Sequence, residues 1–166
     1  VESVSFVLPE SENELRQMIA ALPGMLWTAN PLGMYDFVSP QWHAATGRRL
    51  FELLGSGWLQ AVHPDDRQAV GEHWQQAVHQ PRPVTIELRL CTHDGRPRWF
   101  TLRATPIFDQ QGRVERWFGL CLDIEDFRRT QQALHDSQLR YRVLFENRIN
   151  GVVQLQMLYD ELGAPQ

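Results

Sequence analysis

The densest group of residues that could carry out chemistry is His63-Pro64-Asp65-Asp66. An imidazole beside two carboxylates could act as a general acid or base. The same residues also suit the start of a helix, because proline fits the first helical position and acidic side chains favour the positive end of the helix dipole. The sequence has no nucleophile elbow or phosphate-binding glycine loop to accompany them. We therefore predict a helix start here, and neither catalytic residues nor enzymatic activity in this chain.

The two cysteines, Cys91 and Cys121, lie in apolar runs that are typical of strands. A disulfide between them would require neighbouring strands in a matching register, which spacing alone does not establish. Neither cysteine has the CxxC or HxxxH spacing that accompanies zinc sites. We predict two buried, reduced thiols and no metal site.

The composition is typical of a soluble globular protein, since the 166 residues are 43% hydrophobic and 22% charged. The net charge of −4 does not provide the basic field that nucleic acids require, so we predict no nucleic-acid partner. No apolar run approaches the roughly 18–20 residues of a membrane span, and residues 1–9 do not resemble a signal peptide. We expect a cytoplasmic location and no direct membrane contact for this stretch of chain.

An amphipathic helix is predicted near the N-terminus, where Ser11 and Glu14 form a capping box. Its apolar residues recur at helical spacing and are Leu15, Met18, Ile19 and Leu22. One helix cannot bury its own apolar stripe, so this stripe must pack on a sheet or on a partner. We predict that these four residues form a homodimer interface, with help from Phe127 and Leu134.

The rest of the sequence predicts a mixture of strands and helices, which must position the residues described above. Strands are expected at residues 25–30 and 35–38, then at 84–90, 98–107 and 116–124. Short helical segments are expected at 41–46, 50–54 and 58–62, followed by a longer helix from His63. The last two strands carry large apolar groups on both faces, so we expect the sheet to be covered on both sides. The short helices would cover one face, and the N-terminal helix or a second subunit the other.

The pattern becomes helical again after Asp126. Phe127, Leu134 and Tyr141 are seven residues apart, which is the repeat of a coiled coil. The companion positions Thr130 and Ser137 are polar, and this weakens the seam. Two interpretations stay open: a dimeric coiled coil, and a single amphipathic helix that lies on its own sheet.

Several short strings occur together in a characteristic order. They are Trp58-Leu59-Gln60-Ala61-Val62-His63-Pro64-Asp65-Asp66-Arg67, Glu87-Leu88-Arg89, Asp94-Gly95, Arg98-Trp99-Phe100, Thr105-Pro106-Ile107, Asp109 with Gly112, and Trp117-Phe118-Gly119 with Asp123-Ile124. Over residues 22–129 these strings resemble a PAS domain with its PAC-type C-terminal half. The resemblance implies an α+β fold with a five-stranded antiparallel sheet in the order 2-1-5-4-3. Short helices would lie on one face, with an N-terminal cap helix and a C-terminal signalling helix.

Four segments follow from this resemblance. They are a cap helix at 1–21, the PAS/PAC domain at 22–126, a linker or signalling helix at 127–147, and the start of a second PAS domain at 148–166. The last segment rests on a weaker resemblance, carried by Leu139-Arg140-Tyr141-Arg142-Val143-Leu144-Phe145-Glu146-Asn147 with Gly151-Val152-Val153.

The family implies a sensory and regulatory module of a multidomain signalling protein, of histidine kinase or cyclic-di-GMP enzyme type. The signal would pass to an output domain through the residues that join the last strand to the C-terminal helix, which are Asp123, Ile124, Glu125 and Phe127. In this family the junction resembles Asp-Ile-Thr, and Glu125 replaces the threonine here. The alternative is a ligand-free PAS module that only dimerises or binds other proteins.

Cofactor binding has little support from the motifs. Flavin photosensors of the family use a cysteine in the short-helix region, which has none here, and haem-binding members use a histidine on the long helix, where His73 lies. We predict an exposed His73 and no cofactor. The candidates for a small-molecule pocket are aromatic, namely Trp27, Phe37, Trp42, Trp58, Trp74 and Phe118. These side chains could equally fill the core themselves, and periodicity does not distinguish the two cases.

Overall fold

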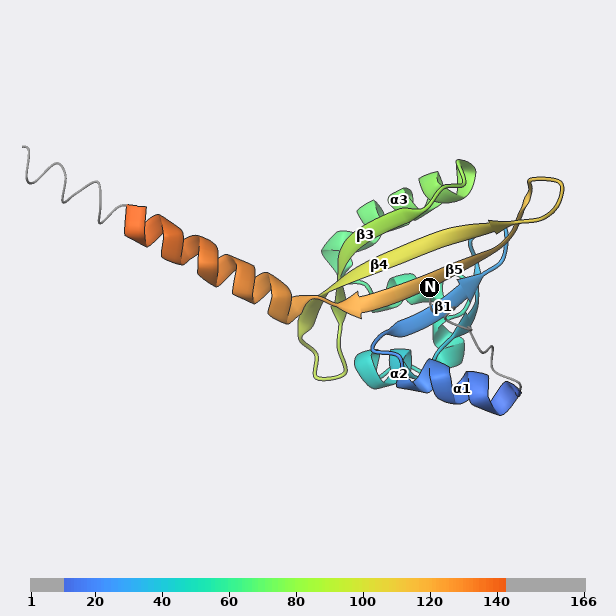
Figure 1. Cartoon of the computed structure of the whole chain (residues 1–166), viewed down its shortest axis with the longest axis horizontal. Coiled ribbons are helices and arrows are strands. Elements are labelled where there is room, and N and C mark those ends of the chain that lie inside the picture. Colours follow the sequence, from blue (N-terminus) through green and yellow to red (C-terminus); the bar gives the residue numbers. More distant parts are fainter. Residues whose placement is uncertain (1–10, 143–166) are drawn as a thin grey trace, which may run out of the picture. The chain divides into compact units, whose positions relative to one another are not determined.

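The computed structural model describes residues 11–142 of the chain, apart from the side chains of Glu12, Leu15 and Arg16 (Figure 1). In chain order the elements are α1 (Glu12–Ala21), β1 (Met25–Ala29), β2 (Tyr35–Val38), α2 (Gln41–Thr46), the 3-10 helices η1 (Leu50–Leu53), η2 (Gly57–Ala61) and η3 (Pro64–Asp66), α3 (Arg67–His79), β3 (Val84–Cys91), β4 (Pro97–Phe108) and β5 (Val114–Asp123). A helix over residues 125–142 follows. The second PAS segment predicted at 148–166 lies outside the described residues.

The five strands form one antiparallel sheet in the order β2-β1-β5-β4-β3. This order and the fold class predicted from the sequence are confirmed. The first strand therefore pairs with the last, which brings the start of β1 beside the end of β5. The N-terminal and C-terminal boundaries of the sheet domain consequently lie at the same end of the sheet.

Helix α1 begins as its capping residues predict, because the amide of Glu14 donates to Ser11 Oγ at 3.2 Å. It is held at its other end by Gln41, whose side-chain amide donates to the carbonyls of Ile19 and Ala20 at 3.1 and 3.2 Å. The last carbonyls of a helix lack partners within the helix, so Gln41 supplies them from α2.

The core lies between one face of the sheet and the helices α2, η2 and α3, and its centre is aromatic. Tyr35 is stacked between Trp27 and Trp58, with ring centroids 4.3 and 5.0 Å away. Trp74 contacts Trp27 and Trp117 edge-on at 5.4 and 5.0 Å. Each such pair stabilises the fold by about 0.5–1.5 kcal/mol beyond the burial of its area.

The opposite face of the sheet is less covered than the sequence predicts. Phe118 and Phe37 are 50% and 41% exposed, and both lie on this outer face. Thr28 of β1 lies between them, paired with Phe37 on β2 and with Phe118 on β5. They flank a hollow of about 360 Å³ that Ile19 of α1 also lines. The single chain thus leaves an apolar area on its outer sheet face.

Candidate functional site

The junction between the sheet and the C-terminal helix is organised by Asp123, the last residue of β5. One carboxylate oxygen of Asp123 accepts from Arg98 Nε at 2.8 Å, and the other accepts from the amide of Glu125 at 2.9 Å. The second bond satisfies a free amide in the first helical turn, and the negative charge favours that end of the helix dipole. A single side chain therefore connects β4 to the beginning of the helix.

Glu125 adds a second connection to β4. Its carboxylate accepts from the backbone amide of Trp99 at 3.0 Å, and the amide of Ile124 donates to the Trp99 carbonyl at 2.9 Å. The family resemblance places threonine at this position, so the sequence left any contact of that hydroxyl in doubt. In this chain the longer carboxylate supplies the acceptor.

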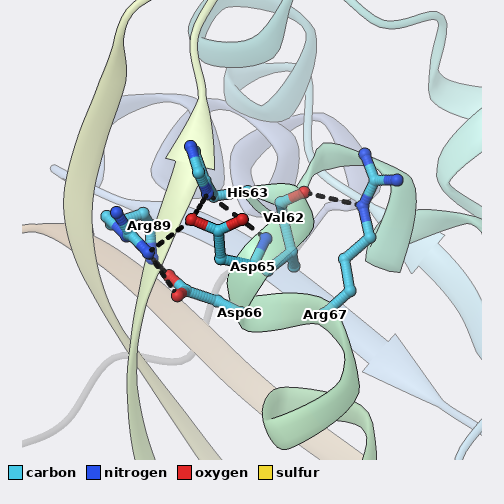
Figure 2. A network of polar contacts seen from close by, with 6 residues as sticks. All are labelled: Val62, His63, Asp65, Asp66, Arg67 and Arg89. Carbon is cyan, nitrogen blue, oxygen red and sulfur yellow. Dashed lines mark hydrogen bonds and ion pairs between the residues drawn. The ribbon is translucent and has the colours of Figure 1, made fainter.

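A second network lies where α3 begins, at the residues that first suggested chemistry. Figure 2 shows Arg89 extending from β3 to the aspartates of the helix start. Arg89 donates to both oxygens of Asp66, at 2.8 and 2.6 Å, and it lies 3.8 Å from Asp65. His63 caps the turn, because its Nδ1 accepts from the amide of Asp65 at 3.4 Å. The predicted helix start is confirmed.

This network also covers part of one edge of the sheet, near the end of β3. β3 is an edge strand, and the segment before α3 runs along it, with a bridge from Val62 to Leu90 and a 2.8 Å bond from the His63 amide to the Arg89 carbonyl. Covered edges are protected from pairing with other chains. The hydrogen bonds from Arg89 hold the pKa of the Asp66 carboxyl below its usual range.

Arg89 links the two networks. Its guanidinium lies 5.7 Å from the centre of the Trp99 ring, within the range of a cation–π contact. The backbone of Trp99 in turn holds Ile124 and Glu125. A continuous set of contacts therefore runs from the start of α3, across β3 and β4, to the start of the C-terminal helix.

The predicted pocket residues divide between the two faces of the sheet. Trp27, Trp42, Trp58 and Trp74 are buried in the core, at most 2% exposed, whereas Phe37 and Phe118 lie on the outer face. The six side chains therefore do not line a common cavity. Tyr35 and Trp117 complete the core cluster, although sequence reasoning did not select them. Their alternation with exposed neighbours in the strands was the available signal.

Three polar atoms of the core cluster are buried without a hydrogen-bond partner among the described residues: Trp27 Nε1, Trp117 Nε1 and Tyr35 Oη. By contrast, Trp42 and Trp74 donate to the carbonyls of Leu26 and Gly33 at 3.1 and 3.0 Å. Burial raises the pKa of Tyr35 well above its usual value, so its hydroxyl stays protonated and can donate.

The structure also locates the titratable residues named above. Both cysteines are free thiols, as predicted, and Cys121 is buried. Cys91 is only half-buried, so the prediction that both thiols are buried is wrong for Cys91. Burial raises the pKa of the Cys121 thiol, which makes it unreactive. His73 is exposed on α3, as predicted. Within residues 11–142 no cluster of histidine, cysteine and carboxylate side chains has metal-binding geometry, and no helix there is both long and apolar enough to cross a bilayer.

Two larger clefts lie on the helical side of the sheet. One, of about 750 Å³, runs along α3 beside η2, and the buried rings of Trp58 and Trp74 form part of its lining. The other, of about 660 Å³, lies at the end of the sheet where Asp123 and Arg98 form part of its wall. The second cleft therefore borders the junction described above.

The family model described as the PAS fold matches residues 35–121, which is just over half of the chain. The chain belongs to the PAS family. Its PAS domain superimposes with a TM-score of 0.57 and 25% identity on a sensory box histidine kinase/response regulator from Burkholderia thailandensis, over 78% of this chain and 98% of that one. Both the fold and the recognition from sequence are thereby confirmed.

Curated relatives place this PAS domain among signalling proteins. The chain is 33% identical to an uncharacterized protein, y4lL, of Sinorhizobium fredii, over 84% of its length and 17% of that protein. It is 29% identical to the two-component sensor PprA of Pseudomonas aeruginosa, over 80% and 15% of the two lengths. It is 25% identical to a protein named probable diguanylate cyclase DgcE of Escherichia coli, over 60% and 9%. The chain is a sensory PAS domain homologous to segments of the two signalling proteins. It spans less than a fifth of the length of each of the three relatives.

Proposed function

We propose that this PAS domain is the regulatory module of a multidomain signalling protein and that it passes its state to the C-terminal helix through the junction. The observation that carries the proposal is the double role of Asp123, which binds Arg98 of β4 with one oxygen and the Glu125 amide with the other. A shift of β4 relative to β5 must alter at least one of these bonds. The first turn of the helix then loses or gains a hydrogen-bond partner, and the conformation of the helix changes in response.

The rest of the parent protein follows as part of the same proposal. Relatives named as a two-component sensor and a diguanylate cyclase favour an output domain of histidine kinase or cyclic-di-GMP enzyme type, C-terminal to this chain. We retain the division into a cap helix at 1–21, the PAS/PAC domain at 22–126, a signalling helix at 127–147 and a second PAS domain from 148. In this scheme the chain itself is non-catalytic, cytoplasmic, and free of nucleic-acid and membrane contacts.

We also propose that the module works as a homodimer. Met18 and Leu22 of the predicted interface are 54% and 48% exposed, and Leu134 is 60% exposed. Ile19 and the exposed ring of Phe118 flank the same hollow on the outer face. A second copy that packs on α1 and this face would bury apolar groups that one chain leaves in water.

The aromatic core favours a second candidate function, a ligand-free module that only dimerises and relays contacts. Trp27, Tyr35, Trp58, Trp74 and Trp117 occupy the space between the sheet and its helices. A ligand at that place would have to displace at least one of these rings. This candidate and the first share the junction, and they differ in whether a small molecule binds.

Hydrogen–deuterium exchange on the 166-residue chain tests the relay. Arg98→Gln changes only a β4 side chain, yet we expect faster exchange in the first turns of the helix at 125–142. Asp109→Asn is the matched control, because Asp109 also accepts from a backbone amide and from the side chain of Arg113, but in the turn between β4 and β5. The proposal fails if the two variants change exchange in the helix equally, or if Arg98→Gln leaves the helix unaffected.

A further inference from the structure

The cleft of about 660 Å³ at the end of the sheet has the dimensions of a small-molecule site. It lies between α2 on one side and the turn between β3 and β4 on the other. All of its lining residues belong to the sheet domain, and none of them is a tryptophan or Tyr35. Binding here would therefore not require displacement of a tryptophan.

The floor of the cleft is apolar. Met25, Phe100 and Cys121 form it, and they are 4%, 4% and 0% exposed. The wall on α2 includes Ala44 and Ala45, whose short side chains leave the space open. An aliphatic or aromatic group could enter this space and be removed from water.

The rim of the cleft carries charges of both signs. Arg98 and Asp123 form an ion pair of 2.8 Å that remains 39% and 40% exposed. His93 and Asp94 face the same cleft from the β3–β4 turn. A hydrogen bond from the Thr92 hydroxyl is the main reason why the pKa of Asp94 lies below its usual range, so this carboxylate is ionised at neutral pH.

A ligand with one charge fits this rim poorly. An anion would meet the carboxylates of Asp94 and Asp123, and a cation would meet the guanidinium of Arg98. A molecule that carries an ammonium group next to a carboxylate can pair with both signs at once. We propose that this cleft binds a small zwitterion with an apolar body, of the class of the apolar α-amino acids.

Such a ligand would act directly on the junction. Its carboxylate would compete with Asp123 for Arg98, while Asp123 also holds the Glu125 amide at the start of the helix. Gln41, which holds the last carbonyls of α1, lines the same cleft. The binding part of this inference stands alone, and the effect on the helix rests on the proposed relay function.

Calorimetric titration of the 166-residue chain with leucine tests the binding part. Isocaproate and isoamylamine share the leucine side chain but lack the ammonium and the carboxylate, respectively, and glycine lacks the apolar body. We expect leucine, methionine or phenylalanine to bind at least about tenfold more tightly than all three analogues. Absence of binding for all three amino acids up to about 10 mM, or equal binding of glycine, overturns the inference.

Variants locate the site. Ala44→Phe places a ring in the mouth of the cleft from an exposed position, and Arg98→Gln removes the cation; both should weaken binding about tenfold or more. Arg103→Gln is the control, since Arg103 lies on β4 but lines the outer hollow. Equal affinity in all variants overturns the site. If leucine binds but hydrogen exchange of the helix at 125–142 stays unchanged, the coupling between the cleft and the helix is overturned, and this result also counts against the proposed relay function. If leucine does not bind, the relay function is unaffected.

Discussion

Gly119→Ala is expected to destabilise the fold through the aromatic core. A Cβ atom at Gly119 would stand 2.5 Å from Nε1 of Trp27 and closer still to two carbons of the same ring, although Cβ contacts below 3.0 Å essentially never occur. The indole is stacked on Tyr35 at 4.3 Å and contacts Trp74 at 5.4 Å, so it has to push against both rings to make room.

Overpacking of this kind costs about 1–3 kcal/mol in free energy of unfolding. For a domain of this size, each kcal/mol lowers Tm by about 4–8 °C, so a loss of about 2 kcal/mol corresponds to roughly 10 °C. Thermal and urea unfolding, followed by tryptophan fluorescence and circular dichroism, measure both quantities. The near-ultraviolet signal should also change, because the rings that produce it move.

Gly71→Ala is the matched control, with an expected effect of opposite sign. Gly71 lies inside α3, and an added Cβ would come no closer than 3.8 Å to Leu59. Replacing a helical glycine by alanine should stabilise the fold by about 0.5–1 kcal/mol. If Gly119→Ala unfolds at the wild-type temperature, the core has free space beside Trp27. That result would refute the filled core and favour a ligand cavity there.

Three further predictions concern charge, assembly and thiol chemistry. Hydrogen bonding lowers the pKa of Asp66 in the folded state, so its contribution to stability is present above about pH 4 and is lost as the pH falls through the folded pKa. In Asp66→Asn, the urea concentration at the midpoint of unfolding should therefore fall less steeply as the pH is lowered. Met18→Asp with Leu22→Asp should yield a monomer in sedimentation equilibrium, and an unchanged mass would contradict the proposed interface. Iodoacetamide at pH 8 should label Cys91 in the folded protein but Cys121 only after unfolding, since burial raises the pKa of the Cys121 thiol; equal labelling of both would contradict this.

The sequence predicted the residues of the junction better than their contacts. Asp123 and Glu125 were identified because Asp123-Ile124-Glu125, at the end of the last strand, resembles the Asp-Ile-Thr junction of the family, and such a string is a local feature. Their partners Arg98 and Trp99 are more than twenty positions away and reach them only because β4 pairs with β5. The contact of Arg89 with Asp66 was likewise invisible, because it depends on the edge of β3.

The sequence by itself determined the succession of strands and helices along the chain and the helix start at Pro64, because alternation, turn residues and capping residues act over a few positions. The order of the strands in the sheet followed from the family resemblance. Only the tertiary structure decided which aromatic rings enter the core. An irregularity in the pairing of β1 with β2 turns Tyr35 inward and leaves Phe37 in solvent. On β5, Trp117 faces the helices and Phe118 faces outward. The physical reason is that one residue of register moves a side chain to the opposite face, and register is set by strands that are distant in sequence.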